Sequence, residues 1–462
     1  MFNKHIYSQR RQRLKETVNN GIILLLGNEE SSMNYKDNLY PFRQDSTFLY
    51  FFGIDRPSVT AIIDIENNSE ILFGDNLTTE QMVWTGFREP LESVAEKTGV
   101  TRVKRRNEME AVLKNAQAQS RPVHFLPPYR PEQANTLGAL LNTGLDALQN
   151  MASVSLIKAI VEQRSIKSGE EIEEITKAVN TTVRMQLAAI TMAREGMTEA
   201  EVAGNIHSIA IAEGGNLSFP SILTINGQIL HIGYSQAKLR NGDLVLCDCG
   251  AETAMRYAGD LTRTFPVSGS FTSMQNEIYD IVLEAHQAAV SMLKTGIWYR
   301  DVHLFACEKL TEGLKQLGLM KGDVKEAVDQ GAHALFFPCG LGHMLGLDTH
   351  DMENLGEKYV GYNDEVVQST QFGLKSLRLG RALEEGFVIT VEPGLYFNAQ
   401  LMEEWAAAKK CHDFINYEKL GLYKNAGGIR IEEDFLITKS GSLLLGNPLP
   451  KKAREIETLR VA

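Results

Sequence analysis

Short apolar runs alternate with helical patterns along the first 165 residues. Strand-like runs occur at 21–27, 59–65, 70–74 and 122–126, and stretches with helical spacing at 91–98 and 131–141. This alternation is typical of a small α/β domain in which helices cover a sheet. We therefore predict such a domain over residues 1–165.

A polar passage at residues 163–171 separates this domain from a second one. Apolar residues at helical spacing follow it: Ile172, Ile175, Val179, Val183 and Leu187. They predict an amphipathic helix. We place the boundary within 161–167, so the second domain spans 166–462, and the 43% hydrophobic residues suffice for both cores.

The second domain contains an internal repeat. A helical stretch, Gly196 and a second helical stretch are followed 100 positions later by the same order around Gly296. The strands that follow also correspond, because each of them delivers a carboxylate at its end. We predict two half-domains around a pseudo-two-fold axis, with their strands in one sheet.

The repeated strands begin after a glycine and end at an acidic residue. Gly242 precedes Asp248 by six residues across an apolar strand, and Gly386 precedes Glu392 by six across another. A site shared between the two halves explains why its residues lie so far apart in the sequence.

Five potential metal ligands stand in short motifs of this domain. They are Asp248 in LVLCDCGAE, Asp260 in YAGDLTRTF, His343 in GLGHMLGLDTHD, Glu392 in ITVEPGLY and Glu432 in GIRIEED. Four carboxylates and one imidazole carry too much negative charge for one small cation, but they suit two divalent ions that share carboxylates. The set predicts a dinuclear metallohydrolase.

Strand alternation separates Asp248 from its neighbours. Cys247 and Cys249 lie on the opposite face of the strand. A Cys-X-Cys zinc site therefore conflicts with Asp248 as a ligand, and we predict that both thiols are small buried apolar groups. A loop at residues 252–256 returns the chain and brings Asp260 back beside Asp248.

His343 lies among glycines that allow close backbone approach. Their spacing, GxGxxxG, is not a dinucleotide-binding fingerprint. A lone histidine among apolar residues is more often a core residue, but His350 beside Asp351, seven positions later, favours a site. A thiol hydrolase with Cys339 and His343 is a weaker alternative, because nothing nearby in the sequence orients the histidine.

The last two ligands stand at strand ends. Glu392 precedes Pro393-Gly394, so its strand stops there. Arg430 and Glu432 share one strand face, so the arginine is placed to orient the ligand or bind substrate. For Glu433 and Asp434, a surface salt bridge is the alternative role.

Composition narrows the class of partner. The net charge of −11 argues against nucleic acid and anionic membranes, which leaves peptides and small molecules. The N-terminus lacks a secretory pattern, and no run approaches the roughly 20 apolar residues that span a bilayer. Five cysteines without a framework spacing indicate reduced thiols. We expect a cytoplasmic protein.

These motifs resemble those of the pita-bread metallopeptidases, the family of aminopeptidase P, prolidase and methionine aminopeptidase. All five ligand positions match, and YPFRQDS at 40–46 with FLYFFG at 48–53 resembles the aminopeptidase P N-terminal domain. The resemblance covers most of the chain and implies an α/β (α+β) fold, with a C-terminal pita-bread domain that contains a curved antiparallel sheet. The N-terminal motif disfavours methionine aminopeptidase, and the intact ligands disfavour creatinase and non-enzymatic relatives.

The resemblance also implies roles for the ligands. Asp248 would chelate one metal, Asp260 and Glu432 would bridge, and His343 with Glu392 would hold the other. The usual family metal is Mn²⁺, which suits oxygen ligands. A metal-bridging hydroxide would attack the scissile carbonyl, and Glu392 would pass a proton to the leaving proline nitrogen.

Four further residues receive roles by the same resemblance. His231 would help bind substrate near the scissile bond, and His350 would stabilise the tetrahedral intermediate. Tyr396 and Arg430 are candidates for positioning the substrate.

Two departures from the family pattern bear on specificity. The loop between Asp248 and Asp260 is one residue longer than the commonest form. Residues 397–427 form an insertion with a predicted helix at 402–410, where prolidases carry an arginine that captures the dipeptide carboxylate. The insertion offers only lysines as substitutes: Lys409, Lys410, Lys419 and Lys424.

The leading hypothesis is therefore an Xaa-Pro aminopeptidase that acts on peptides with proline at the second position. The alternatives are a prolidase restricted to Xaa-Pro dipeptides and a non-catalytic module that reuses the scaffold. Family members are commonly dimers or tetramers, so the resemblance implies a homo-oligomer.

Overall fold

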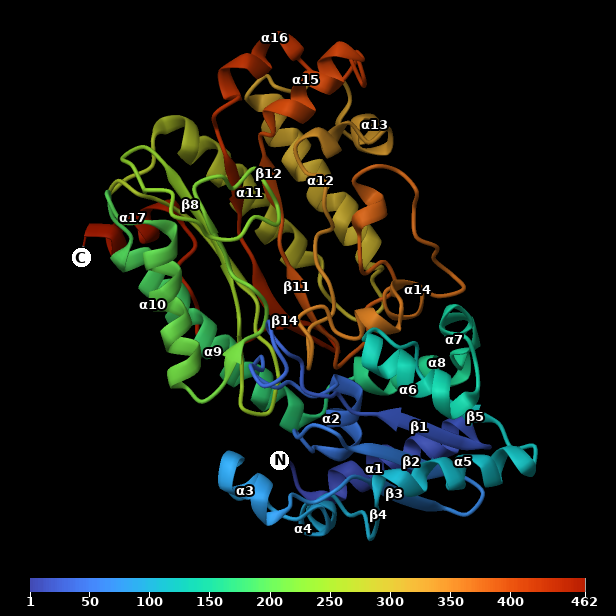
Figure 1. The fold of residues 1–462 in the computed structure, drawn as a ribbon. Coiled ribbons are helices and arrows are strands. Elements are labelled where there is room, and N and C mark those ends of the chain that lie inside the picture. The colour runs from blue at the N-terminus through green and yellow to red at the C-terminus, as the bar shows by residue number, and fades with distance from the viewer. Residues whose placement is uncertain (462) are drawn as a thin grey trace. The chain divides into compact units, whose positions relative to one another are not determined.

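The computed structural model describes residues 1–461, which divide into two compact units. The first unit comprises Met1–Arg164 with Met352–Tyr359. The second comprises Ser165–Asp351 and the chain from Val360 onward. In Figure 1 the first unit runs from blue to cyan, and the second runs mostly from green to red.

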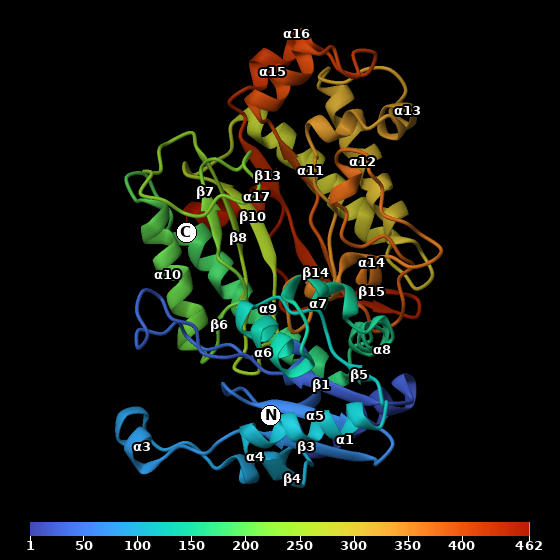
Figure 2. The same ribbon diagram turned by 45° about the vertical axis from the view of Figure 1, so that its right-hand side comes forward.

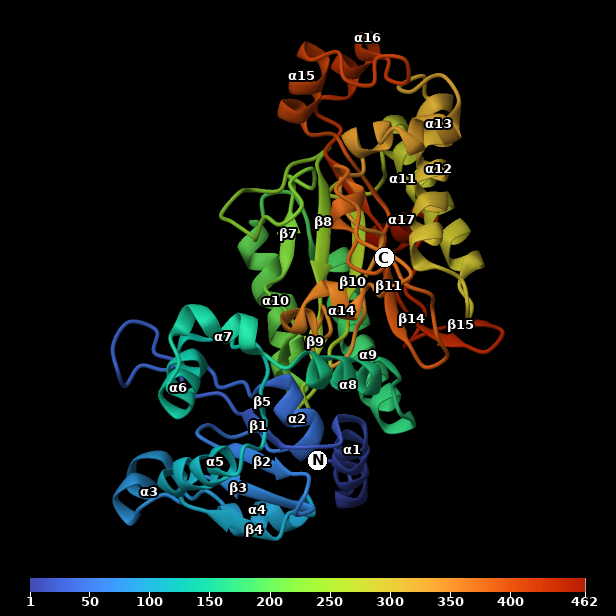
Figure 3. The same ribbon diagram turned by 90° about the vertical axis from the view of Figure 1, so that its right-hand side faces the viewer.

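The first unit is built on a mixed sheet of five strands in the order β4-β3-β2-β1-β5. Its strands are β1 (Ile22–Leu26), β2 (Thr60–Asp64), β3 (Ser69–Phe73), β4 (Arg102–Lys104) and β5 (Val123–His124). Its helices are α1 (Lys4–Val18), α2 (Ser46–Phe52), α3 (Thr79–Thr85), α4 (Leu91–Lys97), α5 (Met109–Ala118), α6 (Pro131–Leu141), α7 (Leu145–Met151) and α8 (Val154–Ser165). Figure 3 shows β1, β2 and β3 side by side.

The core of this unit follows from strand alternation. Ile22, Leu24 and Ile62 on one sheet face pack against Leu113 of α5 and Leu137 of α6. These side chains are fully buried, and burial of large aliphatic groups is the main favourable contribution to folding. The predicted small α/β domain is confirmed.

The second unit holds two helix pairs and four small antiparallel sheets. The helices after α8 are α9 (Gly169–Met192), α10 (Glu199–Ala212), α11 (Ser273–Met292), α12 (Tyr299–Gln316), α13 (Val324–Asp329), α14 (Glu357–Val360), α15 (Ala399–Ala407), α16 (Tyr417–Leu420) and α17 (Ala453–Val461). Of these, α14 belongs to the first unit up to Tyr359. The strands are β6 (Asn216–Leu217), β7 (Ile222–Thr224), β8 (Leu244–Cys249), β9 (Ala251–Glu252), β10 (Leu261–Pro266), β11 (Val388–Val391), β12 (Gly394–Tyr396), β13 (Gly428–Arg430), β14 (Glu433–Thr438) and β15 (Gly441–Leu444).

The two halves of this unit meet between their sheets. One sheet has the order β10-β8-β7 and another the order β11-β14-β15. The Glu432 N–H donates to the Thr262 carbonyl at 3.1 Å, which ties the end of β13 to β10. In Figure 1 the strands run between the pair α9 and α10 on one side and the pair α11 and α12 on the other.

Backbone hydrogen bonds confirm the predicted repeat. The Gly196 N–H donates to Leu239 at 3.0 Å, and the Gly296 N–H donates to Leu383 at 2.8 Å. Both glycines have a left-handed φ, 89° and 87°, a conformation that costs glycine little. In each half, the turn between the two paired helices is thus hydrogen-bonded to the segment that precedes β8 or β11.

The insertion at residues 397–427 is helical, but its first helix is α15 at Ala399–Ala407 and not 402–410. The side chain of Asn398 accepts the Leu401 N–H at 3.0 Å and so caps the helix three residues earlier than its apolar pattern indicated. Figure 2 shows α15 and α16 together at one end of this unit. Among residues 1–461, no helix combines the length and the apolar character required to cross a membrane.

Candidate active site

The five predicted ligands line one cavity of about 580 Å³ in the second unit. Its charged and imidazole lining residues are Asp248, Asp260, Glu392, Glu432, His231, His343, His350, Arg378 and Arg430. The set brings together residues from both half-domains and from the long segment between them.

The β8–β10 hairpin supplies the two aspartates. Asp248 pairs with Thr262 in the antiparallel register, so the return strand brings Asp260 to the same end of the hairpin. The Asp260 N–H donates to Asp434 Oδ2 at 3.0 Å. At Gly259 a Cβ would lie 2.7 Å from the Val179 nitrogen, so only glycine lets the strand approach α9 this closely.

The second half supplies His343 and Glu392. Imidazole Nδ1 of His343 lies 3.0 Å from the Met344 carbonyl, a contact that places the ring proton on Nδ1 and makes Nε2 the nitrogen suited to bind a metal. That Nε2 is 3.4 Å from Asp260 Oδ2 and 3.7 Å from Glu392 Oε1. The Glu392 N–H donates to the Leu341 carbonyl at 2.7 Å, which fixes the strand end.

Glu432 completes the carboxylate set. It is 2% exposed, and its Oε2 accepts a hydrogen bond from Thr262 Oγ1 at 2.7 Å. Donor atoms of Asp260, His343 and Glu432 all lie within 4.8 Å of one another. This spacing brings three of the five ligand candidates within reach of a single cation.

The closely spaced carboxylates of the site favour the binding of cations. Burial, then repulsion from neighbouring carboxylates, raises the pKa of Asp260 and Glu432 well above their usual range. Burial also raises the pKa of Glu392, whereas His343 and Arg430 oppose that rise. Asp248 Oδ1 and Asp260 Oδ1 are buried without a hydrogen-bond partner. Divalent ions would satisfy both the orphaned oxygens and the crowded charge.

Arg430 is held inside the site by its contacts. Its Nη2 donates to Asp248 Oδ2, its Nη1 to the Tyr396 hydroxyl at 2.8 Å and its Nε to Thr262 Oγ1 at 3.2 Å. The guanidinium therefore fixes Asp248 directly. Tyr396 is 2% exposed and lies behind Arg430 rather than in the cavity lining.

The two further histidines reach the cavity from different segments. The His350 ring lies 4.3 Å from the His343 ring, centroid to centroid, in an edge-on arrangement. His231 comes from the loop after β7. Burial and the Arg430 charge lower the pKa of His231, so it is neutral at pH 7 and can either donate or accept a hydrogen bond.

Sequence reasoning missed Arg378 and misjudged Glu433 and Asp434. Arg378 lines the cavity, and its charge opposes the rise in the pKa of Glu392; it stands in an irregular segment that carries no periodic signal. Glu433 and Asp434 are 2% and 0% exposed, so a surface salt bridge is wrong for both. Glu433 instead forms a buried ion pair with Arg263 at 2.7 Å.

The cysteines do not contribute a nucleophile. Cys247 and Cys249 are fully buried, and the Cys249 thiol accepts a hydrogen bond from Gln186, which confirms them as core residues. Burial, then the Glu392 charge, raises the pKa of Cys339 to about 12, so its thiol stays protonated at neutral pH.

The lysines of the insertion are absent from the cavity lining. Lys410 Nζ lies 3.8 Å above the Trp405 ring, and Lys424 forms an ion pair with Glu403 at 2.6 Å. Lys419 donates to the Leu317 carbonyl at 3.1 Å.

A duplicated domain with three buried carboxylates, one partly buried carboxylate and one oriented imidazole in a single cavity defines a metallohydrolase. Comparison with known proteins gives its family: metallopeptidase family M24 matches residues 173–439, and the aminopeptidase P N-terminal domain matches residues 7–124. The chain belongs to metallopeptidase family M24. The expected pita-bread fold and the metallopeptidase class are confirmed, and the family implies divalent metal ions.

Relatives span nearly the whole chain. It is 33% identical to the Xaa-Pro aminopeptidase of Escherichia coli (strain K12), over 99% of this chain and 97% of that protein. It is 31% identical to the human Xaa-Pro dipeptidase, over 98% of this chain and 92% of that protein.

Solved structures show the same similarity. Aminopeptidase P from E. coli with the inhibitor Pro-Leu superposes with a TM-score of 0.81 at 31% identity, covering 100% of this chain and 98% of that one. Proline aminopeptidase P II from Yersinia pestis gives a TM-score of 0.80 at 29% identity, covering 100% of both chains.

Proposed function

We propose that this protein is an Xaa-Pro aminopeptidase, which hydrolyses the bond between the N-terminal residue of a peptide and a proline at the second position. The observation that carries the proposal is the convergence of Asp248, Asp260, His343, Glu392 and Glu432 in one cavity. The aminopeptidase P N-terminal domain and the activity named for the E. coli relative support the proline specificity.

We propose that these five residues hold two divalent ions, with Mn²⁺ as the metal. The donor set of four carboxylates and one nitrogen fits hard cations, and the orphaned oxygens of Asp248 and Asp260 support the assignment. When bound, such ions acidify a water to a nucleophile and stabilise negative charge on the scissile carbonyl.

The protein's own residues would supply proton transfer and orientation. Glu392, with its raised pKa, is suited to take a proton from water and return it to the leaving proline nitrogen. His231 and His350 would donate hydrogen bonds to the substrate near the scissile bond. Arg430 would keep Asp248 in place, and Tyr396 would orient the Arg430 guanidinium.

Kinetics on a length series tests the proposal. We expect Mn²⁺-loaded protein to release the first residue from Xaa-Pro-Xaa peptides and longer ones, and Asp260→Ala to lose that activity. Asp280→Ala, on the solvent side of α11 away from the cavity lining, serves as the control and should retain it. Cleavage of Xaa-Pro dipeptides alone would overturn the aminopeptidase proposal.

Arg378 favours a second candidate, an Xaa-Pro dipeptidase. A guanidinium in the cavity can bind the free carboxylate that follows proline in a dipeptide through two parallel hydrogen bonds. Arg378→Ala would then lower kcat/KM for a dipeptide at least about 10-fold more than for a tripeptide, and Arg378→Lys would not restore it. An equal effect on both substrates would remove this candidate.

We propose a cytoplasmic location and a homo-oligomeric state for the chain. All five cysteines are free in the structure, which suits a reducing compartment. Support for self-association comes from the exposed apolar residues Val83, Trp84 and Phe87 of the first unit.

A further inference from the structure

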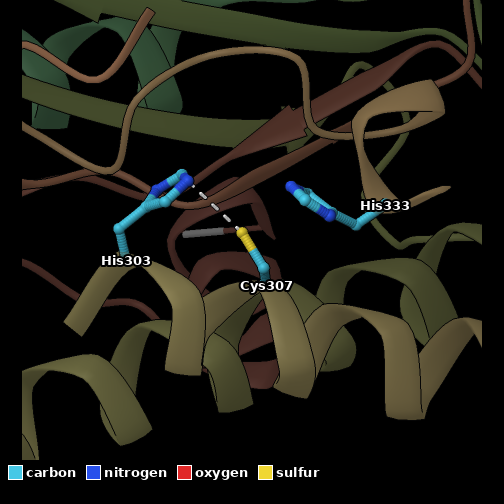
Figure 4. Close-up of side chains that lie close together, drawn as sticks. All are labelled: His303, Cys307 and His333. Atoms are coloured by element: carbon cyan, nitrogen blue, oxygen red, sulfur yellow. Dashed lines mark hydrogen bonds between the residues drawn. The ribbon is translucent and has the colours of Figure 1, made fainter. Parts of the chain in front are cut away.

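A second cluster of metal-ligand side chains lies in the catalytic unit and shares no residue with the carboxylate site. His303 and Cys307 stand one turn apart on α12, and His333 belongs to the 3₁₀ turn Ala332–Leu335. Figure 4 shows the Cys307 sulfur between the two imidazole rings. One donor atom from each residue lies within 4.8 Å of the others.

The polar atoms of this cluster are buried and under-satisfied. The three residues are 1%, 0% and 2% exposed. Within the cluster, Cys307 Sγ and His303 Nε2 form a hydrogen bond at 3.5 Å. His303 Nδ1 and both ring nitrogens of His333 have no hydrogen-bond partner among the described residues. Native cores rarely leave such groups unpaired.

The cluster has the chemistry of a soft-metal site. Two imidazoles and one thiol are typical zinc ligands, and residues i and i+4 of a helix project from the same face. Zn–N bonds of about 2.0–2.1 Å and a Zn–S bond of about 2.3 Å at a tetrahedral angle place the nitrogen and sulfur about 3.5 Å apart. His303 and Cys307 already have that separation.

Both rings are available as ligands at neutral pH. Burial lowers the pKa of His303 to about 3 and that of His333 to about 4, so neither carries a proton that competes with a metal. The Val328 backbone opposes the lowering of the His333 pKa.

We propose that His303, Cys307 and His333 form a second metal site, separate from the catalytic centre, which takes a thiophilic divalent ion such as Zn²⁺. Binding would deprotonate the Cys307 thiol and release that proton to solvent, and the thiolate would form the metal–sulfur bond. Because the ligands are buried, the ion would enter as the chain folds. This would lock α12 to the 3₁₀ turn at Ala332–Leu335.

Cobalt substitution tests the site apart from catalysis. Protein produced in Co²⁺-supplemented medium should show thiolate-to-cobalt charge-transfer absorption in the near ultraviolet, which oxygen and nitrogen ligands do not give. The band should persist in Asp260→Ala and in the control Cys411→Ser, and it should disappear in Cys307→Ser. A wild-type protein without the band, or a Cys307→Ser variant with it, would overturn the proposal.

A second variant, His333→Gln, tests the site even if Cys307→Ser does not fold. His333→Gln keeps the thiol and the helix but removes one ligand. With the fold checked by circular dichroism, its metal content should fall by one equivalent per chain and its affinity for Zn²⁺ by more than about 100-fold, beyond the 10–100-fold cost of losing an outer partner. Equal metal content in the wild type and His333→Gln would contradict the site.

Discussion

At the scale of single residues, the ligands depend on neighbours that hold them. Thr262 Oγ1 donates to Glu432 and accepts from Arg430, which itself holds Asp248. This one hydroxyl thus helps to hold Asp248 on β8 and Glu432 at the end of β13. Thr262→Val removes that hydroxyl with almost no change in shape.

We expect Thr262→Val to weaken Mn²⁺ binding by about 10- to 100-fold, the usual cost of losing a partner of a metal ligand. The measurement is peptidase activity as a function of free Mn²⁺. Thr295→Val, an exposed threonine whose hydroxyl donates to the Thr438 carbonyl, is the control and should titrate like the wild type. An unchanged midpoint in Thr262→Val would show that the hydroxyl does not support the ligands.

His286 makes the stability of the catalytic unit depend on pH. Burial lowers the pKa of His286 to about 3, although Glu433 opposes the shift, whereas the unfolded value is about 6.5. Between these values the unfolded chain binds a proton that the folded chain does not. Stability is therefore full above about pH 6.5 and is lost as the pH falls toward 3.

His286→Phe should flatten this dependence. Denaturant unfolding below pH 6.5 should give a slope that is smaller by up to about 1.4 kcal/mol per pH unit than in the wild type. His412→Phe, whose side chain is 67% exposed in the wild type, should leave the slope unchanged. Equal slopes for wild type and His286→Phe would mean that His286 titrates normally in the fold.

The convergence of the five ligand candidates in one cavity could be predicted from the sequence because strand alternation and chain breaks act locally. Asp248 and Glu392 each end a predicted strand, so their direction was fixed by their neighbours. Arg378 could not be predicted, because its place depends on an irregular segment. Asp434 was misjudged because its burial depends on Asp260, which is 174 residues away in the sequence.

At the scale of elements, the repeat fixes where each half places its carboxylate. Gly242 and Gly386 open the two corresponding strands with φ values of 95° and 92°. A Cβ at Gly386 would lie 2.9 Å from Ile166 Cγ2, whereas a Cβ at Gly242 would meet nothing within 4 Å. A side chain at either position would therefore meet the same unfavourable backbone conformation, but only a side chain at Gly386 would also contact Ile166.

Gly242→Ala should destabilise the protein by about 1 kcal/mol, the cost of a left-handed conformation with a Cβ. Gly386→Ala should add about 1–3 kcal/mol from crowding against Ile166. Denaturant unfolding of the two variants measures the difference. Equal losses of unfolding free energy would show that the Ile166 side chain moves away from the new Cβ at no cost.

Elements with strong local signals were predicted well, and those that depend on distant contacts were not. The helix α6 begins at Pro131 and ends at Leu141 as predicted, because proline at its first position and the apolar spacing mark it. The irregular stretch between His350 and Phe387 has no periodic pattern, so its path around the cavity followed only from the structure.

At the scale of the whole molecule, an exposed apolar group marks the first unit. Val83, Trp84 and Phe87 are 78%, 84% and 78% exposed, and α3 has no buried residue. Monomeric proteins seldom expose adjacent large apolar side chains. We infer that this group contacts a second copy of the chain.

Analytical ultracentrifugation should find an oligomer for the wild type and a shift toward monomer for Trp84→Ser. Val367→Ser, at an exposed apolar residue elsewhere in the chain (82% exposed), should leave the distribution unchanged. A monomeric wild type at micromolar concentration would exclude this role of α3.

We propose that residues from two half-domains form one metal-dependent peptidase site. The most direct test measures the release of the N-terminal residue from an Xaa-Pro-Xaa tripeptide by chelator-treated protein, before and after addition of Mn²⁺. We expect no activity without metal, and recovery with Mn²⁺ in the wild type but not in Asp260→Ala. Equal rates before and after Mn²⁺, or full activity in Asp260→Ala, would contradict it.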